Sequence, residues 1–135
     1  AMSIHESGQM YLETIYILSQ NKSYVRAIDV GEHLGYSKPS VSRAMSILKK
    51  NGYVLVDADG AITLTESGME IAQTMYTRHT VLSEMLMRLG VDEKTATEDA
   101  CRIEHVISEE SFLAVKKHLE WSISQCMEGQ QDSVE

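Results

Sequence analysis

The chain has 135 residues, and 43% of them are apolar, which is enough for a hydrophobic core in one or two small domains. No apolar run is long enough to span a membrane and no charged-then-apolar leader is present, so we expect a cytoplasmic protein without a membrane segment. The net charge of −8 argues at first sight against nucleic acid as a partner, but the whole acidic excess lies in residues 66–135. Residues 35–56 carry four basic side chains and no acidic one, so this segment is suited to phosphate binding.

The first half of the chain has helical apolar spacing that gives way to β-branched segments. Ser37 is placed to cap a helix, Pro39 suits its first turn, and Asn51-Gly52 suits its end. Asp57-Ala58-Asp59-Gly60 is a strong hairpin turn. The predicted elements are helices at 7–19, 27–34 and 37–51 and strands at 53–56 and 61–64. This order is typical of a winged helix-turn-helix domain, which we assign to residues 1–65.

The second half is predicted to be entirely helical. Gly90 ends the first helix, Asp92 caps the second, and the chain after Cys126 is polar and expected to fray. The predicted helices are 66–89, 92–106 and 108–122. The fold class is therefore mainly α, with an N-terminal winged helix-turn-helix domain followed by an all-helical domain over residues 66–135. Its apolar stripes exceed the needs of one short bundle, which predicts a homodimer through residues that include Val81, Leu82, Met85, Leu86 and Leu89.

The second helix of a helix-turn-helix enters the major groove of DNA with its first turns. In this chain those turns offer short serine hydroxyls, an apolar proline that can meet a thymine methyl, and the fork of Arg43 for guanine. Lysines on the same helix are positioned for phosphates. We therefore expect double-stranded DNA to contact Ser37, Lys38, Pro39, Ser40, Ser42, Arg43, Lys49 and Lys50. The alternative is a solvated basic helix in a bundle.

A candidate metal site lies in the second half. Cys101, Glu104 and His105 stand at i, i+3 and i+4, so they project from one helical face. Thiolate, carboxylate and imidazole suit Fe(II), Mn(II), Co(II), Ni(II) or Zn(II), and Met10 is a candidate fourth ligand. Each residue also has an ordinary interpretation: Cys101 as a small buried group, Glu104 and His105 as solvated or ion-paired, and Met10 as core packing.

Several segments together resemble the diphtheria-toxin-repressor family of metal-dependent bacterial repressors over residues 3–122. The matching segments are Met10-Tyr11-Leu12-Glu13-Thr14-Ile15-Tyr16, Ser37-Lys38-Pro39-Ser40-Val41-Ser42, Leu64-Thr65-Glu66-Ser67-Gly68, Arg78-His79 and Cys101-Arg102-Ile103-Glu104-His105. The resemblance implies that residues 66–135 form a dimerisation and metal-binding domain. It also implies a primary metal site of Met10, Cys101, Glu104 and His105.

The ligands resemble the iron-sensing branch of that family, because its manganese-sensing branch has carboxylates in place of Met10 and Cys101. The chain length instead resembles the manganese branch, which has no SH3-like domain after this region. An ancillary site of the iron branch matches at His79 but departs at Ser83 and Thr97, so it is lost or rebuilt. A second site of Glu13 and His79 is the alternative that resembles the manganese branch.

The sequence therefore predicts a repressor, active with Fe(II), that binds palindromic operators of metal-homeostasis genes. Mn(II) is the alternative activator, and Co(II), Ni(II) or Zn(II) are expected to substitute in vitro. Rival functions are a winged-helix regulator of a small organic ligand, a metal-storage protein, and an enzyme with Cys101 as nucleophile and His105 as base. The enzyme is disfavoured because no oxyanion hole or glycine-rich substrate loop is evident.

Overall fold

The computed structural model describes residues 6–134, with side chains described through residue 127, and divides the chain into two compact units. The division falls after Tyr76, inside a long helix. The predicted functional boundary at residue 65 stays a prediction. None of the helices within the described residues is both long and apolar enough to cross a membrane.

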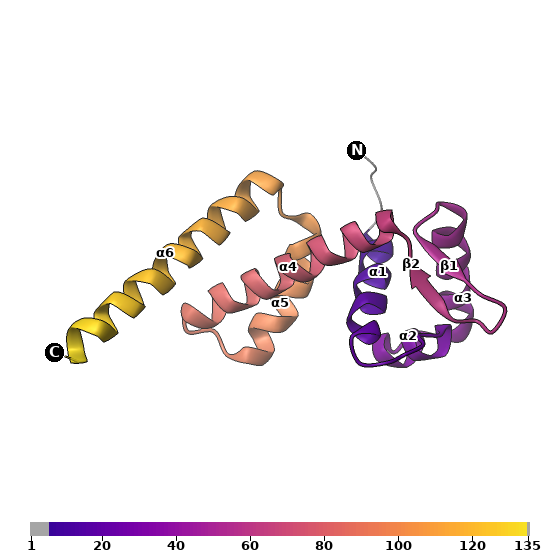
Figure 1. The fold of residues 1–135 in the computed structure, drawn as a ribbon, viewed down its shortest axis with the longest axis horizontal. Helices are drawn as coiled ribbons and strands as arrows, with labels where there is room; N and C mark the ends of the chain where they lie inside the picture. Colours follow the sequence, from indigo (N-terminus) through magenta and orange to yellow (C-terminus); the bar gives the residue numbers. More distant parts are fainter. Residues whose placement is uncertain (1–5, 135) are drawn as a thin grey trace. The chain divides into compact units, whose positions relative to one another are not determined.

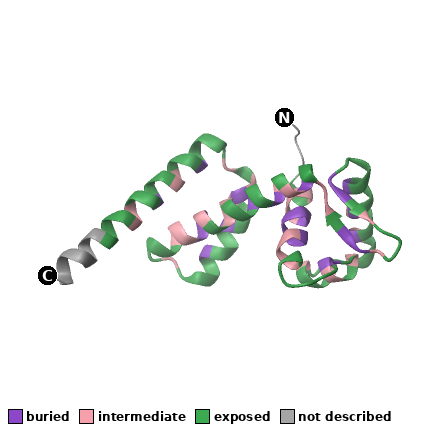
Figure 2. Cartoon of the chain, viewed as in Figure 1, coloured by how far each residue is buried: buried purple, intermediate pink, exposed green. Residues whose placement is uncertain are grey.

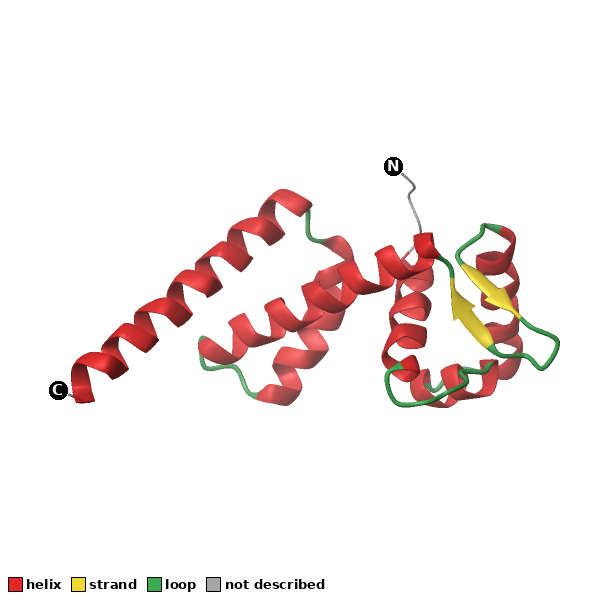
Figure 3. Cartoon of the chain, viewed as in Figure 1, coloured by secondary structure: helices red, strands yellow, loops and turns green. Residues whose placement is uncertain are grey.

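The first unit is a three-helix bundle with a β-hairpin (Figures 1 and 3). Its helices are α1 (Glu6–Ser19), α2 (Ala27–Leu34) and α3 (Lys38–Lys50), and its strands are β1 (Val54–Val56) and β2 (Ile62–Leu64). The strands pair antiparallel with Leu55 opposite Thr63. The amide of Ile62 donates to the carbonyl of Val25 at 2.7 Å, which anchors the hairpin to the segment before α2. The predicted winged helix-turn-helix is confirmed.

The helix boundaries follow from local chemistry. The side chain of Asp29 accepts a hydrogen bond of 2.9 Å from the Arg26 amide at the start of α2, and this bond is the main reason that the pKa of Asp29 is lowered. Gly35 ends α2 in the left-handed region, with φ of 71°, and its amide bonds to the Gly31 carbonyl at 2.8 Å. Ser37 then caps α3, with its hydroxyl 3.4 Å from the Ser40 amide.

The core of the first unit is formed by apolar side chains from every one of its elements (Figure 2). The largest fully buried apolar side chains of this unit are Leu12, Ile15, Val30, Val41 and Val54. Val41, Met45 and Leu48 form the buried face of α3, as the helical spacing predicted, so the opposite face remains exposed to solvent.

The second unit contains the rest of α4 (Glu66–Arg88), with α5 (Glu93–Val106) and α6 (Glu109–Val134). Ala96, Ala100 and Glu104 are buried and spaced by four residues, so they form one face of α5. The prediction that the last helix ends near residue 122 is wrong, because α6 continues to Val134. The residues after Cys126 are polar but include straight-chain helix formers and no proline, so polarity alone does not end the helix.

The main chain near Tyr53 approaches Gly68, close to the start of α4, so closely that it restricts which residue can stand there. The Thr65 hydroxyl donates to the Gly52 carbonyl at 2.7 Å and accepts from the Gly68 amide at 3.2 Å. A Cβ atom added to Gly68 would overlap the carbonyl oxygen of Tyr53. Main chain cannot move aside as a flexible side chain can, so only glycine fits here.

We therefore predict that Gly68→Ala destabilises the protein by about 1–3 kcal/mol, the usual cost of forced overpacking. Ser67→Ala is the matched control, because Ser67 is the exposed neighbour on the same turn. Chemical denaturation of the two variants measures the difference. Equal midpoints for both variants would contradict the close approach of α4 to Tyr53.

Candidate functional site

The second unit brings four of the predicted metal ligands into one cluster. His79 Nδ1 on α4 lies 3.0 Å from Glu104 Oε2 and 3.7 Å from Cys101 Sγ, both on α5. The other carboxylate oxygen, Glu104 Oε1, lies 3.3 Å from His105 Nε2. Glu104 is therefore placed between two imidazoles, and His79 belongs to the same cluster as Cys101.

The donor set fits a transition metal. With bond lengths of about 2.1 Å to nitrogen or oxygen and about 2.3 Å to sulfur, ligand atoms at 90–109° lie about 3.0–3.6 Å apart. The observed separations of 3.0, 3.3 and 3.7 Å fall close to this range. The Glu104 side chain is 1% exposed and its carboxylate is costly to bury without positive charge, which a divalent cation supplies.

At the positions where the ancillary site departs from the family pattern, the side chains make other contacts or offer no strong ligand, and its loss or rebuilding stays a prediction. Ser83 is buried, and its hydroxyl donates to the His79 carbonyl at 2.7 Å, within its own helix. Glu84, the next residue after Ser83, forms an ion pair with Arg88, one turn further along α4, at 3.4 Å. Thr97 is exposed on α5 and supplies no strong metal ligand.

The remaining predicted ligands, Met10 and Glu13, lie one turn apart on α1 of the first unit. The Tyr36 hydroxyl lies 3.8 Å from Met10 Sδ as a hydrogen-bond donor. Tyr36 directly precedes the cap of α3, so the thioether contacts the turn that leads into that helix. A metal-binding role of Met10 and Glu13 stays a prediction.

The predicted DNA-reading residues lie on α3. Pro39, Arg43 and Lys50 are exposed on the face opposite the buried one. Ser37 and Ser40 form hydrogen bonds with each other at the N-terminus of α3, where the Ser37 hydroxyl donates to Ser40 Oγ at 2.9 Å. Their DNA contacts, like those of Lys38, stay predictions.

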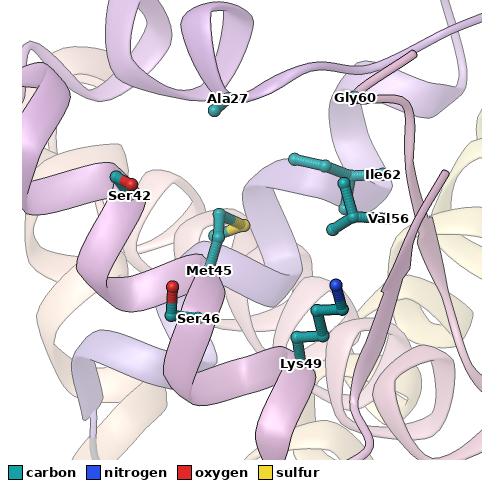
Figure 4. Close-up of a pocket in the computed structure, with 8 residues that line it drawn as sticks. All are labelled: Ala27, Ser42, Met45, Ser46, Lys49, Val56, Gly60 and Ile62. Atoms are coloured by element: carbon teal, nitrogen blue, oxygen red, sulfur yellow. The ribbon is translucent and has the colours of Figure 1, made fainter. Parts of the chain in front are cut away.

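A hollow of about 270 Å³ separates α3 from the hairpin (Figure 4). Ser42, Ser46 and Lys49, spaced by four and three residues, line its α3 side, and the Lys49 amine extends toward the hairpin. The other lining residues are Ala27, Met45, Val56, Gly60 and Ile62. The structure thereby separates Lys49, which lines this hollow, from Lys50, which does not. Ser46 was not among the predicted DNA-contacting residues. Its spacing from Ser42 and Lys49 nevertheless places all three residues on one side of α3.

The hairpin turn has an aspartate for structural reasons. Asp57 Oδ1 accepts hydrogen bonds of 2.9 Å from both the Asp59 and the Ala61 amides. Gly60 has a φ of 84°, a conformation that favours glycine. The Asp57 carboxylate therefore organises the turn, and its negative charge disfavours a close DNA contact there.

Comparison with known proteins identifies the family. Models described as "Iron dependent repressor, N-terminal DNA binding domain" and "Iron dependent repressor, metal binding and dimerisation domain" match residues 3–62 and 65–132. The HTH-type transcriptional regulator MntR of Lysinibacillus sphaericus is 34% identical over 102 residues, which cover 76% of this chain and 73% of that protein. An uncharacterised HTH-type transcriptional regulator of Methanocaldococcus jannaschii is 33% identical over 117 residues, covering 85% of this chain and 94% of that protein.

Two solved structures extend the comparison. A structure titled as a manganese-dependent transcriptional repressor in complex with manganese has a TM-score of 0.77 and 29% identity, covering 84% of this chain and 52% of that one. The manganese regulator SloR has a TM-score of 0.76 and 26% identity, covering 89% and 55%. The chain thus spans about half the length of these solved relatives. It belongs to the iron-dependent repressor family of metal-dependent transcriptional repressors, and this family membership excludes the enzyme alternative, which the sequence already disfavoured.

Arg43 and the two lysines near the end of α3 are predicted to have different roles in DNA binding, which mutation can separate. We predict that Arg43→Ala relaxes sequence preference and costs about 1–3 kcal/mol on the preferred duplex, as for a bidentate contact to guanine. Lys49→Ala and Lys50→Ala should weaken binding to all duplexes alike and lower the salt slope by about one. Titration of preferred and random duplexes at several salt concentrations measures both effects. If Arg43→Ala weakens both duplexes equally, its base-reading role is refuted.

Proposed function

We propose that this protein is an Fe(II)-activated repressor that binds palindromic operators of metal-homeostasis genes as a cytoplasmic homodimer. The single observation that carries the metal dependence is the cluster of His79, Cys101, Glu104 and His105 in the second unit. Its nitrogen, oxygen and sulfur atoms have the separations expected of ligands to one or two divalent ions. The exposed basic face of α3 supports the DNA part of the proposal.

Met10, and Glu13 beside it, are proposed to complete the metal site from the first unit. Ligands contributed by both units would link metal binding to the orientation of α3. A two-fold dimer needs its recognition helices at a spacing that matches half-sites on successive turns of DNA. Only a fraction of the metal-free molecules would have this spacing, and the apparent DNA affinity falls by that fraction.

The second unit is proposed to form the dimer interface. Leu89 is 73% and Trp121 57% exposed, and both are large apolar side chains. Of the predicted stripe, Leu82 is already buried within the chain, whereas Val81, Met85 and Leu86 are half-buried. Exposed apolar surface of this kind is stabilised by burial against a second copy.

Fe(II) is favoured by the sulfur ligands. Mn(II) is the hardest and weakest binder of the first-row series, and a thiolate and a thioether disfavour it further. Mn(II) is the second candidate because the titles of two similar solved structures name manganese. Zn(II) would bind more tightly in vitro, so metal availability in the cell also contributes to selection.

The function is tested by anaerobic selection from a random-sequence DNA duplex library, with Fe(II) and with a chelator. We expect an inverted repeat to be enriched only with metal. Binding of the enriched duplex by His105→Ala should need at least about 10–100-fold more Fe(II), since loss of a residue that only orients a ligand already costs that much. Glu98→Ala, which alters an exposed residue on the same helix as His105, is the control and should behave as wild type. Equal enrichment with chelator would contradict metal dependence.

The choice of metal has a separate test. Met10→Asp combined with Cys101→Glu replaces both sulfur ligands by carboxylates, which Mn(II) accepts readily. We predict that the double variant needs less Mn(II) than wild type for half-maximal duplex binding, and more Fe(II). Titration of both proteins with each ion measures the shift. A wild type that responds at lower Mn(II) than Fe(II) concentration would overturn the iron assignment and leave the repressor function intact.

A further inference from the structure

Arg78 lies on α4 directly before His79, and its guanidinium contacts both of the other helices of the second unit. Nη1 donates to the main-chain carbonyls of Glu104 at 3.1 Å and Ile107 at 2.9 Å. Nη2 pairs with Glu109 Oε2 at 2.8 Å, and the guanidinium lies over the Phe112 ring at 5.4 Å from its centroid. The Arg78 side chain is only 11% exposed.

These contacts fix the C-terminal end of α5. The last carbonyls of a helix have no partner within it, and a cation near them also interacts favourably with the helix dipole. Arg78 satisfies two such carbonyls with one nitrogen. Its pairing with Glu109, in the first turn of α6, holds the next helix to the same point.

Adjacent residues of α4 thus bind the same residue of α5 in two ways. Arg78 bonds to the main chain of Glu104, and His79 contacts the Glu104 side chain. The Cα atoms of Arg78 and His79 are held about 3.8 Å apart by the peptide bond between them. A fixed main-chain position on α5 therefore determines how far the Glu104 carboxylate lies from the His79 ring.

We propose that Arg78 is a positioning residue for the metal site, which sets the spacing between His79 on α4 and the Glu104-His105 turn of α5. This inference rests on the proposed metal-dependent function. The arginine binds no metal itself, because a guanidinium is always protonated and offers no lone pair. It acts by holding ligands from two helices at the spacing that a small cation requires.

Arginine at this position carries one cost despite its contacts. Within the described part of the chain, its Nε atom is buried and makes no hydrogen bond. Burial of an unsatisfied donor is unfavourable. An apolar side chain would avoid this cost but would lose the donors to the Glu104 and Ile107 carbonyls. Lysine, however, has a single compact ammonium and cannot reproduce the planar fork that reaches two carbonyls and a carboxylate together.

The test uses Co(II) as the probe, with the full chain and no DNA. Absorption in the near ultraviolet reports the bond from Cys101 to cobalt, and the visible bands report the coordination geometry. We expect Arg78→Lys to bind Co(II) about tenfold more weakly, the lower end of the effect of residues that orient ligands, with changed visible bands. Arg88→Lys is the matched control, because Arg88 lies on the same helix in an exposed pair with Glu84.

Thermal unfolding without metal separates positioning from stability. A folded Arg78→Lys with wild-type Co(II) affinity and spectrum would overturn the positioning role, whatever its melting temperature. If Arg78→Lys does not fold, Glu109→Ala serves instead, since it removes the acceptor of Nη2 and keeps both carbonyl bonds. This Glu109 variant should bind Co(II) more weakly than wild type, but by a smaller factor than expected for Arg78→Lys. Wild-type Co(II) affinity of the Glu109 variant would overturn the proposal. A wild type that binds no Co(II) would instead overturn the proposed metal function itself.

Discussion

The burial of the Glu104 carboxylate is the constraint on which the second unit depends. A carboxylate that is 1% exposed is costly to bury without polar partners, and its two oxygens lie against different histidines, His79 and His105. One histidine comes from another helix and the other is the next residue in the chain. The packing of α5 through Ala96 and Ala100 therefore directs a charged side chain, rather than a third small one, toward α4.

The packing of α5 places a thiol, a carboxylate and an imidazole close together on the short segment from Cys101 to His105. Cys101 and His105 directly follow the buried residues Ala100 and Glu104, so both lie to the same side of the buried face of α5, while Glu104 lies on it. Cys101 remains exposed although its sulfur lies near His79, so an ion has access from solvent on the thiol side. The site is thus built into the packing of two helices and not into a flexible loop, which favours fixed ligand geometry.

Sequence reasoning predicted most elements because each boundary has local chemistry. Ser37 and Pro39 marked the start of α3, and Asp57 to Gly60 marked the hairpin turn, as the structure confirms. The end of α6 was missed because polar residues do not by themselves stop a helix. The sequence predicted that Cys101, Glu104 and His105 project from one face of a helix, because their spacing lies within a single segment. The contacts of His79 with Cys101 and Glu104 depend on how α4 packs against α5, which no local spacing encodes.

The uneven distribution of charge along the chain has a consequence for how the protein meets DNA. Lys38, Arg43, Lys49 and Lys50 are all exposed on α3, whereas residues 66–135 hold the whole acidic excess. In the field of a polyanion the acidic part is repelled and the basic helix is attracted, so collisions become oriented before contact. The same repulsion shortens non-productive encounters through the other faces of the molecule. Charge that lowers the overall attraction to DNA would thereby increase the share of encounters that begin at α3, the proposed recognition helix.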